Sequence, residues 1–383
     1  MKYVLFVLLP LFLLSSGCMP DTPEALAKRA DQAYHEGNYA RAILTYEALL
    51  KKSGESPIVY YSLALSAFQT QDYSYTIKML EKALASGATT DITDRCYELL
   101  GIVAEREKDL ERAASYYRKV LNSPDTALRV RVLSHLAKIY AKQENYDAAL
   151  ALLLTAQELN STDAVTLYNL GMLCRHEAIN LHHASLDNFR MAERLLPENS
   201  SKLKDAKNQV KRLEGYLTSL KQLPVITGDA SACEKALKQM QSEKKRKNYR
   251  SAERLARKAS EADPSNYEAA LELARLCKQN KNFNDALKAY DTALTIRPNA
   301  TTARFEAAQI AYQNAKKYKA AANYLRPALV ADPRNSTYAD LMGRILYSQQ
   351  QKTNAKQWFE RALRLMAKPT EQYRSWINQL PEA

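Results

Sequence analysis

One phrase of sequence recurs along most of the chain at a spacing near 34 residues. NYARAILTYEALL (Asn38–Leu50) returns as DYSYTIKMLEKAL (Asp72–Leu84), with Tyr39 and Tyr73 34 residues apart. The other copies are DLERAASYYRKVL (Asp109–Leu121), NYDAALALLLTAQ (Asn145–Gln157), NYRSAERLARKAS (Asn248–Ser260), NFNDALKAYDTAL (Asn282–Leu294), KYKAAANYLRPAL (Lys317–Leu329) and KTNAKQWFERALR (Lys352–Arg364). Such self-similarity predicts an array of equivalent supersecondary units that stack to share one core.

Each copy follows a second helical phrase with a small residue near its centre. Gly101, Gly171 and Gly343 are examples. A small residue lets two helices approach closely, and an aromatic side chain on the second helix fills the space beside it. Prolines such as Pro264 and Pro298 close the copies, because proline cannot continue a helix. Only 9 glycines occur in 383 residues, which favours helices over strands with their tight turns.

The pattern resembles the tetratricopeptide repeat, a pair of antiparallel helices of 34 residues with small, aromatic and proline positions in this order. The resemblance implies an all-α fold, an α-solenoid of helix pairs with a concave groove. We expect nine repeats, over residues 23–198 and 232–368. The fifth is distorted by extra residues near EAINLHH.

The repeat pattern is interrupted between residues 199 and 231. Ser201–Leu223 is amphipathic and predicts a helix that caps the first array, and Pro224–Ser231 predicts a short linker. A last helix near Thr370–Leu380 should cap the second array. We therefore expect an N-terminal array at 23–223 with about five repeats, a linker at 224–231, and a basic C-terminal array at 232–383 with about four repeats.

The net charge of +13 lies in one half of the chain. Residues 1–200 carry 21 Lys+Arg and 24 Asp+Glu, a net of −3, whereas residues 201–383 carry 34 and 18, a net of +16. The densest basic run is SEKKRKNYR (Ser242–Arg250). Basic surfaces attract nucleic acid, anionic membranes or acidic proteins, and charge alone does not choose among them. The run is either a solvated helix end or a contact with anionic lipid, glycan or an acidic protein.

The N-terminus has the form of a secretory signal. Lys2 precedes the 12-residue apolar run Tyr3–Leu14, which is shorter than the roughly 20 residues of a spanning helix. Leu14-Ser15-Ser16-Gly17-Cys18 resembles the lipobox of bacterial lipoproteins, although Ser15 stands where that family prefers leucine. The resemblance implies a signal peptide at 1–17, lipidation of Cys18 and a tether at 18–22. A plain secretory signal and an uncleaved anchor or cytosolic protein are the alternatives.

No catalytic motif, cofactor motif or metal motif stands out. There is no Gly-rich phosphate loop, HExxH or GxSxG, and no pair among the five cysteines has CxxC spacing. His176, His182 and His183 cluster near an inter-helix turn but lack a further ligand at a recognised spacing, which favours a solvated turn. We therefore predict a chain that is not an enzyme and that uses no cofactor or metal.

The groove is the best candidate for a binding site. In the resembled family, ligand peptides lie along the first helix of each pair, and mixed aromatic and polar positions suit a peptide. The positions expected to face this groove are Tyr61, Phe68, Lys138, Tyr168, Asn169, Arg175, Arg275, Lys278 and Arg344.

These features predict a lipid-anchored scaffold that binds envelope proteins or peptides and serves the assembly or regulation of a cell-envelope complex. The alternative is an electrostatic adaptor whose basic C-terminal array binds anionic lipid or glycan. The predicted signal argues against nucleic acid as the partner. The expected location is the membrane, facing the periplasm, with the outer membrane favoured because Met19 rather than aspartate follows Cys18.

Overall fold

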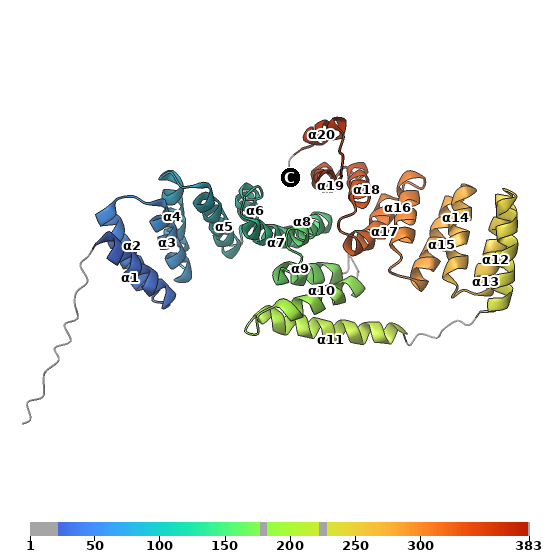
Figure 1. Ribbon diagram of the computed structural model, residues 1–383, viewed down its shortest axis with the longest axis horizontal. Helices are drawn as coiled ribbons and strands as arrows, with labels where there is room; N and C mark the ends of the chain where they lie inside the picture. Colours follow the sequence, from blue (N-terminus) through green and yellow to red (C-terminus); the bar gives the residue numbers. More distant parts are fainter. Residues whose placement is uncertain (1–21, 177–181, 222–227, 382–383) are drawn as a thin grey trace, which may run out of the picture. The chain divides into compact units, whose positions relative to one another are not determined.

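The computed structural model describes residues 22–176, 182–221 and 228–381, so the predicted signal peptide and Cys18 lie outside the described residues. The described part of the chain contains 20 helices and no strand (Figure 1). The first helices of the pairs are α1 (Pro23–His35), α3 (Pro57–Gln69), α5 (Thr90–Arg106), α7 (Thr126–Lys142), α9 (Ala164–Arg175), α12 (Ala230–Lys245), α14 (Tyr267–Gln279), α16 (Thr301–Gln313) and α18 (Ser336–Ser348). The second helices are α2 (Tyr39–Ser53), α4 (Tyr73–Ala85), α6 (Leu110–Lys119), α8 (Tyr146–Leu159), α10 (His182–Leu195), α13 (Tyr249–Ala262), α15 (Phe283–Ile296), α17 (Tyr318–Ala331) and α19 (Lys352–Leu365).

The all-α prediction is confirmed, and each first helix packs against the second helix that follows it. Two further helices occupy the positions predicted for caps. These are α11 (Ser201–Lys221), which packs on α10, and α20 (Glu371–Asn378), which packs on α19. The fold is therefore built from local pairs, as the 34-residue period requires.

Close packing within the pairs depends on the predicted small residues. A Cβ atom added to Gly171 would lie 2.9 Å from ring carbons of Phe189, and one added to Gly343 would lie 2.6 Å from ring carbons of Phe359. Both rings are fully buried. A side chain larger than hydrogen at either glycine would force the two helices of its pair apart.

In the pairs whose turn the structure describes, the helices are joined through a residue with a left-handed backbone, followed by the N-cap of the second helix. Lys247 and Lys281 have φ values of 60° and 64°, the conformation that ends a helix and satisfies its last carbonyls. Asn248 follows, and its side-chain oxygen accepts a hydrogen bond from the backbone N–H of Ser251 at the start of α13. The recurrent Asn or Asp of the repeat phrase is therefore the N-cap of the second helix.

The chain divides into two compact units, Met1–Ser123 and Pro124–Ala383. The first holds α1 to α6 and the second holds α7 to α20. Helices on both sides of the predicted linker at 224–231 thus belong to the same unit, and α12 already begins at Ala230. Half of that linker lies outside the described residues, so the division into two arrays stays a prediction.

Within the second unit, α19 packs against α8. Arg326 of α17 forms a two-bonded ion pair with Asp147 of α8, at 2.7 and 2.8 Å, and the indole N–H of Trp358 donates to the Asp147 carbonyl oxygen at 3.2 Å. Arg361 of α19 is fully buried and donates to Glu158 of α8. Because α8 has buried side chains on nearly every face, including Leu150, it needs a second packing partner.

Candidate functional site

A hollow of about 260 Å³ lies between α7 and α9, and we call it the α7–α9 hollow. Its apolar lining includes Leu153, Met172 and Leu173. Lys138 from α7 and Asn169 from α9 also line it, so two of the predicted groove residues meet at one cavity. The volume is at the small end of ligand pockets, which suits one side chain of a bound peptide.

Tyr146 and His176 line the same hollow but were not among the predicted groove residues. Their ring centroids are 4.4 Å apart, and the Tyr146 hydroxyl lies 3.2 Å from His176 Nε2. Tyr146 is the first residue of α8 and His176 caps the end of α9, so the turns that follow α7 and α9 each bring one aromatic ring to the cavity. The repeat phrase places an aromatic residue at the first position of the second helix, and that signal could have identified Tyr146.

Positive charge gathers beside the hollow. Lys138 and Lys142 are exposed and line it. Burial lowers the pKa of Lys202 on α11, and the like charge of Lys138 lowers it further. The Nε atom of Arg175, at the end of α9, is buried and has no hydrogen-bond partner among the described residues. An acidic group on a ligand would therefore be attracted to this place.

Tyr168, another predicted groove residue, contacts the capping helix α11. Its hydroxyl donates to Asp205 of α11 at 2.6 Å, and the Lys202 ammonium lies 5.6 Å from the centre of its ring. Burial, together with Asp205, raises the pKa of Tyr168 to about 12. The tyrosine therefore fixes the capping helix to the last repeat of the predicted first array.

Tyr61 and Phe68 lie on α3, in the other compact unit, so they cannot be assigned to the α7–α9 hollow. Both are half-buried and pack against the core of their own unit. Burial raises the pKa of Tyr61 to about 12, and the Phe68 ring contacts Tyr73 with centroids 5.9 Å apart.

The remaining predicted residues lie on α14 and α18. Arg275 forms two hydrogen bonds to Glu306, at 3.0 and 3.1 Å, and Arg344 donates to Asp340 at 2.7 Å. Lys278 is exposed. Although burial opposes it, the hydrogen bonds from Arg275 and Tyr290 lower the pKa of Glu306, so this ion pair is intact at neutral pH.

The cysteines of the described part are buried and free. Burial raises the pKa of Cys96, Cys174 and Cys277 to about 12, so they behave as small apolar groups. Across residues 22–176, 182–221 and 228–381, no three His, Cys, Asp or Glu side chains gather as metal ligands would. His182 contacts Tyr216, whereas His176 contacts Tyr146.

Comparison with family models identifies the class of protein. Models of the tetratricopeptide repeat match residues 27–88, 100–164, 244–310, 279–345 and 338–368. The chain therefore belongs to the tetratricopeptide-repeat family. This membership supports a scaffold for protein–protein interaction, and such repeats are typically not enzymes.

Structure comparison finds several solved repeat proteins at low similarity. The chain is 18% identical to YrrB, described as a TPR protein with an unusual peptide-binding site, over 49% of this chain and 100% of that one, with a TM-score of 0.37. It is 17% identical to MamA from Desulfovibrio magneticus RS-1, over 39% of this chain and 83% of that one, with a TM-score of 0.35. It is 14% identical to a chain of the Cut9–Hcn1 complex, over 92% of this chain and 81% of that one, with a TM-score of 0.35. No curated protein matches the chain in sequence.

Proposed function

We propose that this chain is a lipid-tethered scaffold that binds a peptide segment of a partner protein in the α7–α9 hollow. The observation that carries the proposal is the hollow itself, in which an apolar lining adjoins Lys138 and Asn169. The apolar lining suits a leucine-sized or aromatic side chain of the peptide. Lys138 attracts a neighbouring carboxylate, and the Asn169 amide can bond the peptide backbone.

The partner is a protein of the cell envelope, and the scaffold serves assembly or regulation of an envelope complex. The signal-like apolar run and the Leu14–Cys18 motif support this location, since a lipid on Cys18 would hold the binding surface at a membrane. None of the helices in the described ranges is long and apolar enough to cross a membrane.

Selection from a library of random peptides displayed on phage tests the binding site. Peptides that bind should share a large apolar residue next to Asp or Glu. The double variant Lys138→Glu/Asn169→Ala should weaken the binding of a selected peptide about tenfold or more, because a charge attraction becomes a repulsion and an amide hydrogen bond is lost. Titration of the labelled peptide, followed by fluorescence anisotropy, gives the affinity.

The matched control is Lys235→Glu on α12, which makes the same charge change at an exposed lysine that does not line the hollow. The affinity of this variant for the peptide should stay within about twofold of that of the unmodified chain, a change in binding free energy of less than about 0.5 kcal/mol. Selected peptides without acidic residues, or equal losses in both variants, would refute the proposed site.

A further inference from the structure

The turns within the pairs α12–α13, α14–α15 and α16–α17 form a surface that the peptide site does not use, and we call it the basic turn edge. Two hollows lie on it, of about 560 Å³ and about 660 Å³. Asn282 lines both, so the two hollows adjoin. Their volumes fall within the usual range of small-molecule sites.

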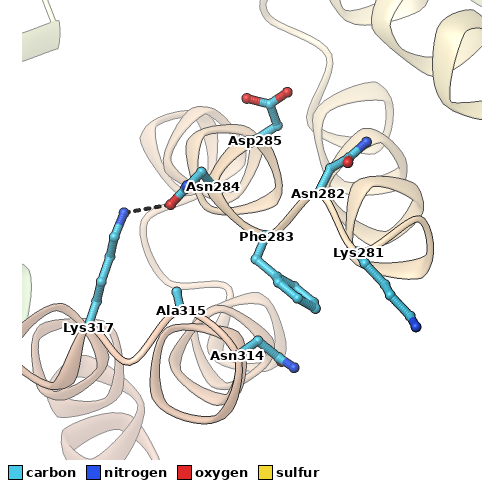
Figure 2. A pocket seen from close by; sticks show the side chains of 8 residues that line it. All are labelled: Lys281, Asn282, Phe283, Asn284, Asp285, Asn314, Ala315 and Lys317. Atoms are coloured by element: carbon cyan, nitrogen blue, oxygen red, sulfur yellow. Dashed lines mark hydrogen bonds between the residues drawn. The ribbon is translucent and has the colours of Figure 1, made fainter.

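Amide side chains are the common feature of the two linings. They are Asn248, Asn280, Asn282, Asn284 and Asn314. An amide has two donor hydrogens and one acceptor oxygen, a combination that matches the hydroxyl groups of a sugar. Asn248, Asn280 and Asn282 already donate to Glu243 or Glu253, and Asn284 accepts from Lys317, so a sugar would use Asn314 and the remaining atoms of the other amides. Figure 2 shows the ring of Phe283 projecting between Lys281 and Asn314, where a sugar ring could lie against its face.

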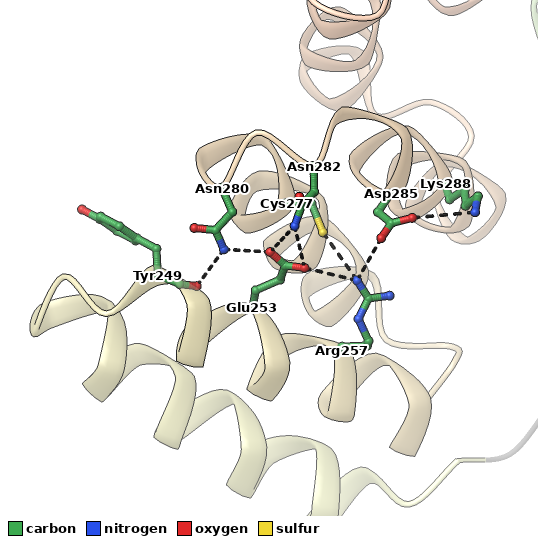
Figure 3. A network of polar contacts seen from close by, with 8 residues as sticks. All are labelled: Tyr249, Glu253, Arg257, Cys277, Asn280, Asn282, Asp285 and Lys288. Carbon is green, nitrogen blue, oxygen red and sulfur yellow. Dashed lines mark hydrogen bonds and ion pairs between the residues drawn. The ribbon is translucent and has the colours of Figure 1, made fainter.

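The carboxylates in the linings are already paired. Arg257 lies 3.3 Å from Glu253 and 3.4 Å from Asp285, and Asp285 also has Lys288 at 3.7 Å (Figure 3). Asn280 and Asn282 donate further hydrogen bonds to Glu253. Neither carboxylate is therefore left to repel an anionic ligand.

The cations in the linings remain available. Arg250, Arg254 and Lys281 line the hollows and form no ion pair within the described residues, and Lys317 donates only to the neutral Asn284, at 2.8 Å. Lys281 also adopts a left-handed backbone with φ of 64°, although other turns carry Gln71 or Glu144 in the same conformation. What distinguishes these three turns is thus their charge, since the hollow at the α7–α8 and α18–α19 turns is also lined by amides such as Asn145 and Asn354.

We propose that the basic turn edge binds an anionic glycan, a sugar polymer that carries carboxylate or phosphate groups. Cations bind the acidic groups, while asparagine amides and the Phe283 ring bind the sugar itself. A flat bilayer surface would neither fill the hollows nor use the amides that line them, so the hollows favour a glycan over a lipid surface. This site is independent of the peptide site in the α7–α9 hollow.

Binding of the full chain to polygalacturonate, a carboxylated sugar polymer, tests the proposal. The double variant Arg254→Gln/Lys281→Gln should weaken binding about tenfold or more, since it removes two charge-assisted contacts. Asn314→Ala should weaken it about threefold through the loss of one amide hydrogen bond without any change in charge. Isothermal titration calorimetry gives the affinities, and unchanged thermal unfolding shows that the variants fold.

Two comparisons decide whether the effect is specific to this surface. Lys235→Gln/Lys368→Gln removes the same charge from exposed lysines outside the hollows and should leave binding within about twofold of the unmodified chain. Vesicles that contain an anionic phospholipid should bind more weakly than polygalacturonate. Equal losses in the two double variants, unchanged binding by Asn314→Ala, stronger binding to the vesicles, or no binding to polygalacturonate would each overturn the proposal.

Discussion

Arg361 brings a full positive charge into the contact between α19 and α8. Its side chain is fully buried, and it donates to Glu158, to Thr155 Oγ1 at 3.0 Å and to the Pro333 carbonyl oxygen at 2.6 Å. Burial lowers the pKa of Arg361 to about 10, which still leaves it protonated at neutral pH. The contact therefore depends on a charge whose compensation comes from α8.

Replacement of Glu158 tests whether the contact between α8 and α19 depends on the ion pair with Arg361. We expect Glu158→Ala to lower the free energy of unfolding by about 3–5 kcal/mol, because it leaves the Arg361 guanidinium buried without its anion. Glu158→Gln, which keeps an acceptor oxygen, should cost less. Urea unfolding followed by tryptophan emission gives both values.

The control is Glu234→Ala, which breaks an exposed pair with Lys238 on α12 and should leave stability nearly unchanged. If Glu158→Ala were no more destabilising than this control, the guanidinium would have to be compensated by another group.

At the scale of elements, three of the helix pairs have an aromatic ring of the second helix packed against a glycine of the first. The pattern of small and aromatic residues could be read from the sequence, and the structure confirms it at Gly101, Gly171 and Gly343. Helices α11 and α20 lie within the segments predicted as caps, because amphipathic spacing is a local property. Prediction succeeded wherever the cause lay within one pair.

Gly343→Ala tests this close approach. An added methyl group would collide with the Phe359 ring, and overpacking should cost about 1–3 kcal/mol, more than the roughly 1 kcal/mol that alanine contributes to a helix. Gly215→Ala in α11 is the matched control, since nothing lies within 4 Å of its added Cβ. It should stabilise the chain by about 0.5–1 kcal/mol. Chemical unfolding that shows the same sign for both substitutions would contradict this account.

At the scale of the whole molecule, we propose that a lipid tether at the N-terminus holds the binding surfaces of the repeats at a membrane. The tether rests on Cys18 and the apolar run before it, whereas the surfaces lie on the repeats. Most of the charge that would act on partners lies in residues 201–383. A lipid anchor would raise the local concentration of these surfaces at a membrane.

Cys18→Ala should therefore release the protein from the membrane fraction. A single lipid-bearing residue carries the whole anchor in the proposal, so its loss should shift most of the protein to the soluble fraction. Fractionation of cells followed by immunoblotting measures the shift, with Cys96→Ala as a control for the loss of a thiol. Retention of Cys18→Ala on membranes would contradict the lipid tether.

The candidate sites were only partly predictable. Lys138 and Asn169 lie on first helices, which the resembled family uses for binding, and both line one cavity. The pairing of Arg275 with Glu306, and of Arg344 with Asp340, was not foreseen, because periodicity gives the face of a side chain but not its partner.

The sequence by itself determined the repeat, the helix pairs, the caps and the charge asymmetry, because these follow from spacing, small residues and helix caps within about 34 residues. Only the tertiary structure decided that the end of the chain packs on α8, where Arg326 pairs with Asp147 across 179 residues. The side chains of α8 are buried on nearly every face, which requires another packing partner, but no local pattern could identify α19. Contacts between residues so far apart in the sequence depend on the angle at which each repeat packs on the next. Side-chain packing sets that angle, and the 34-residue period does not.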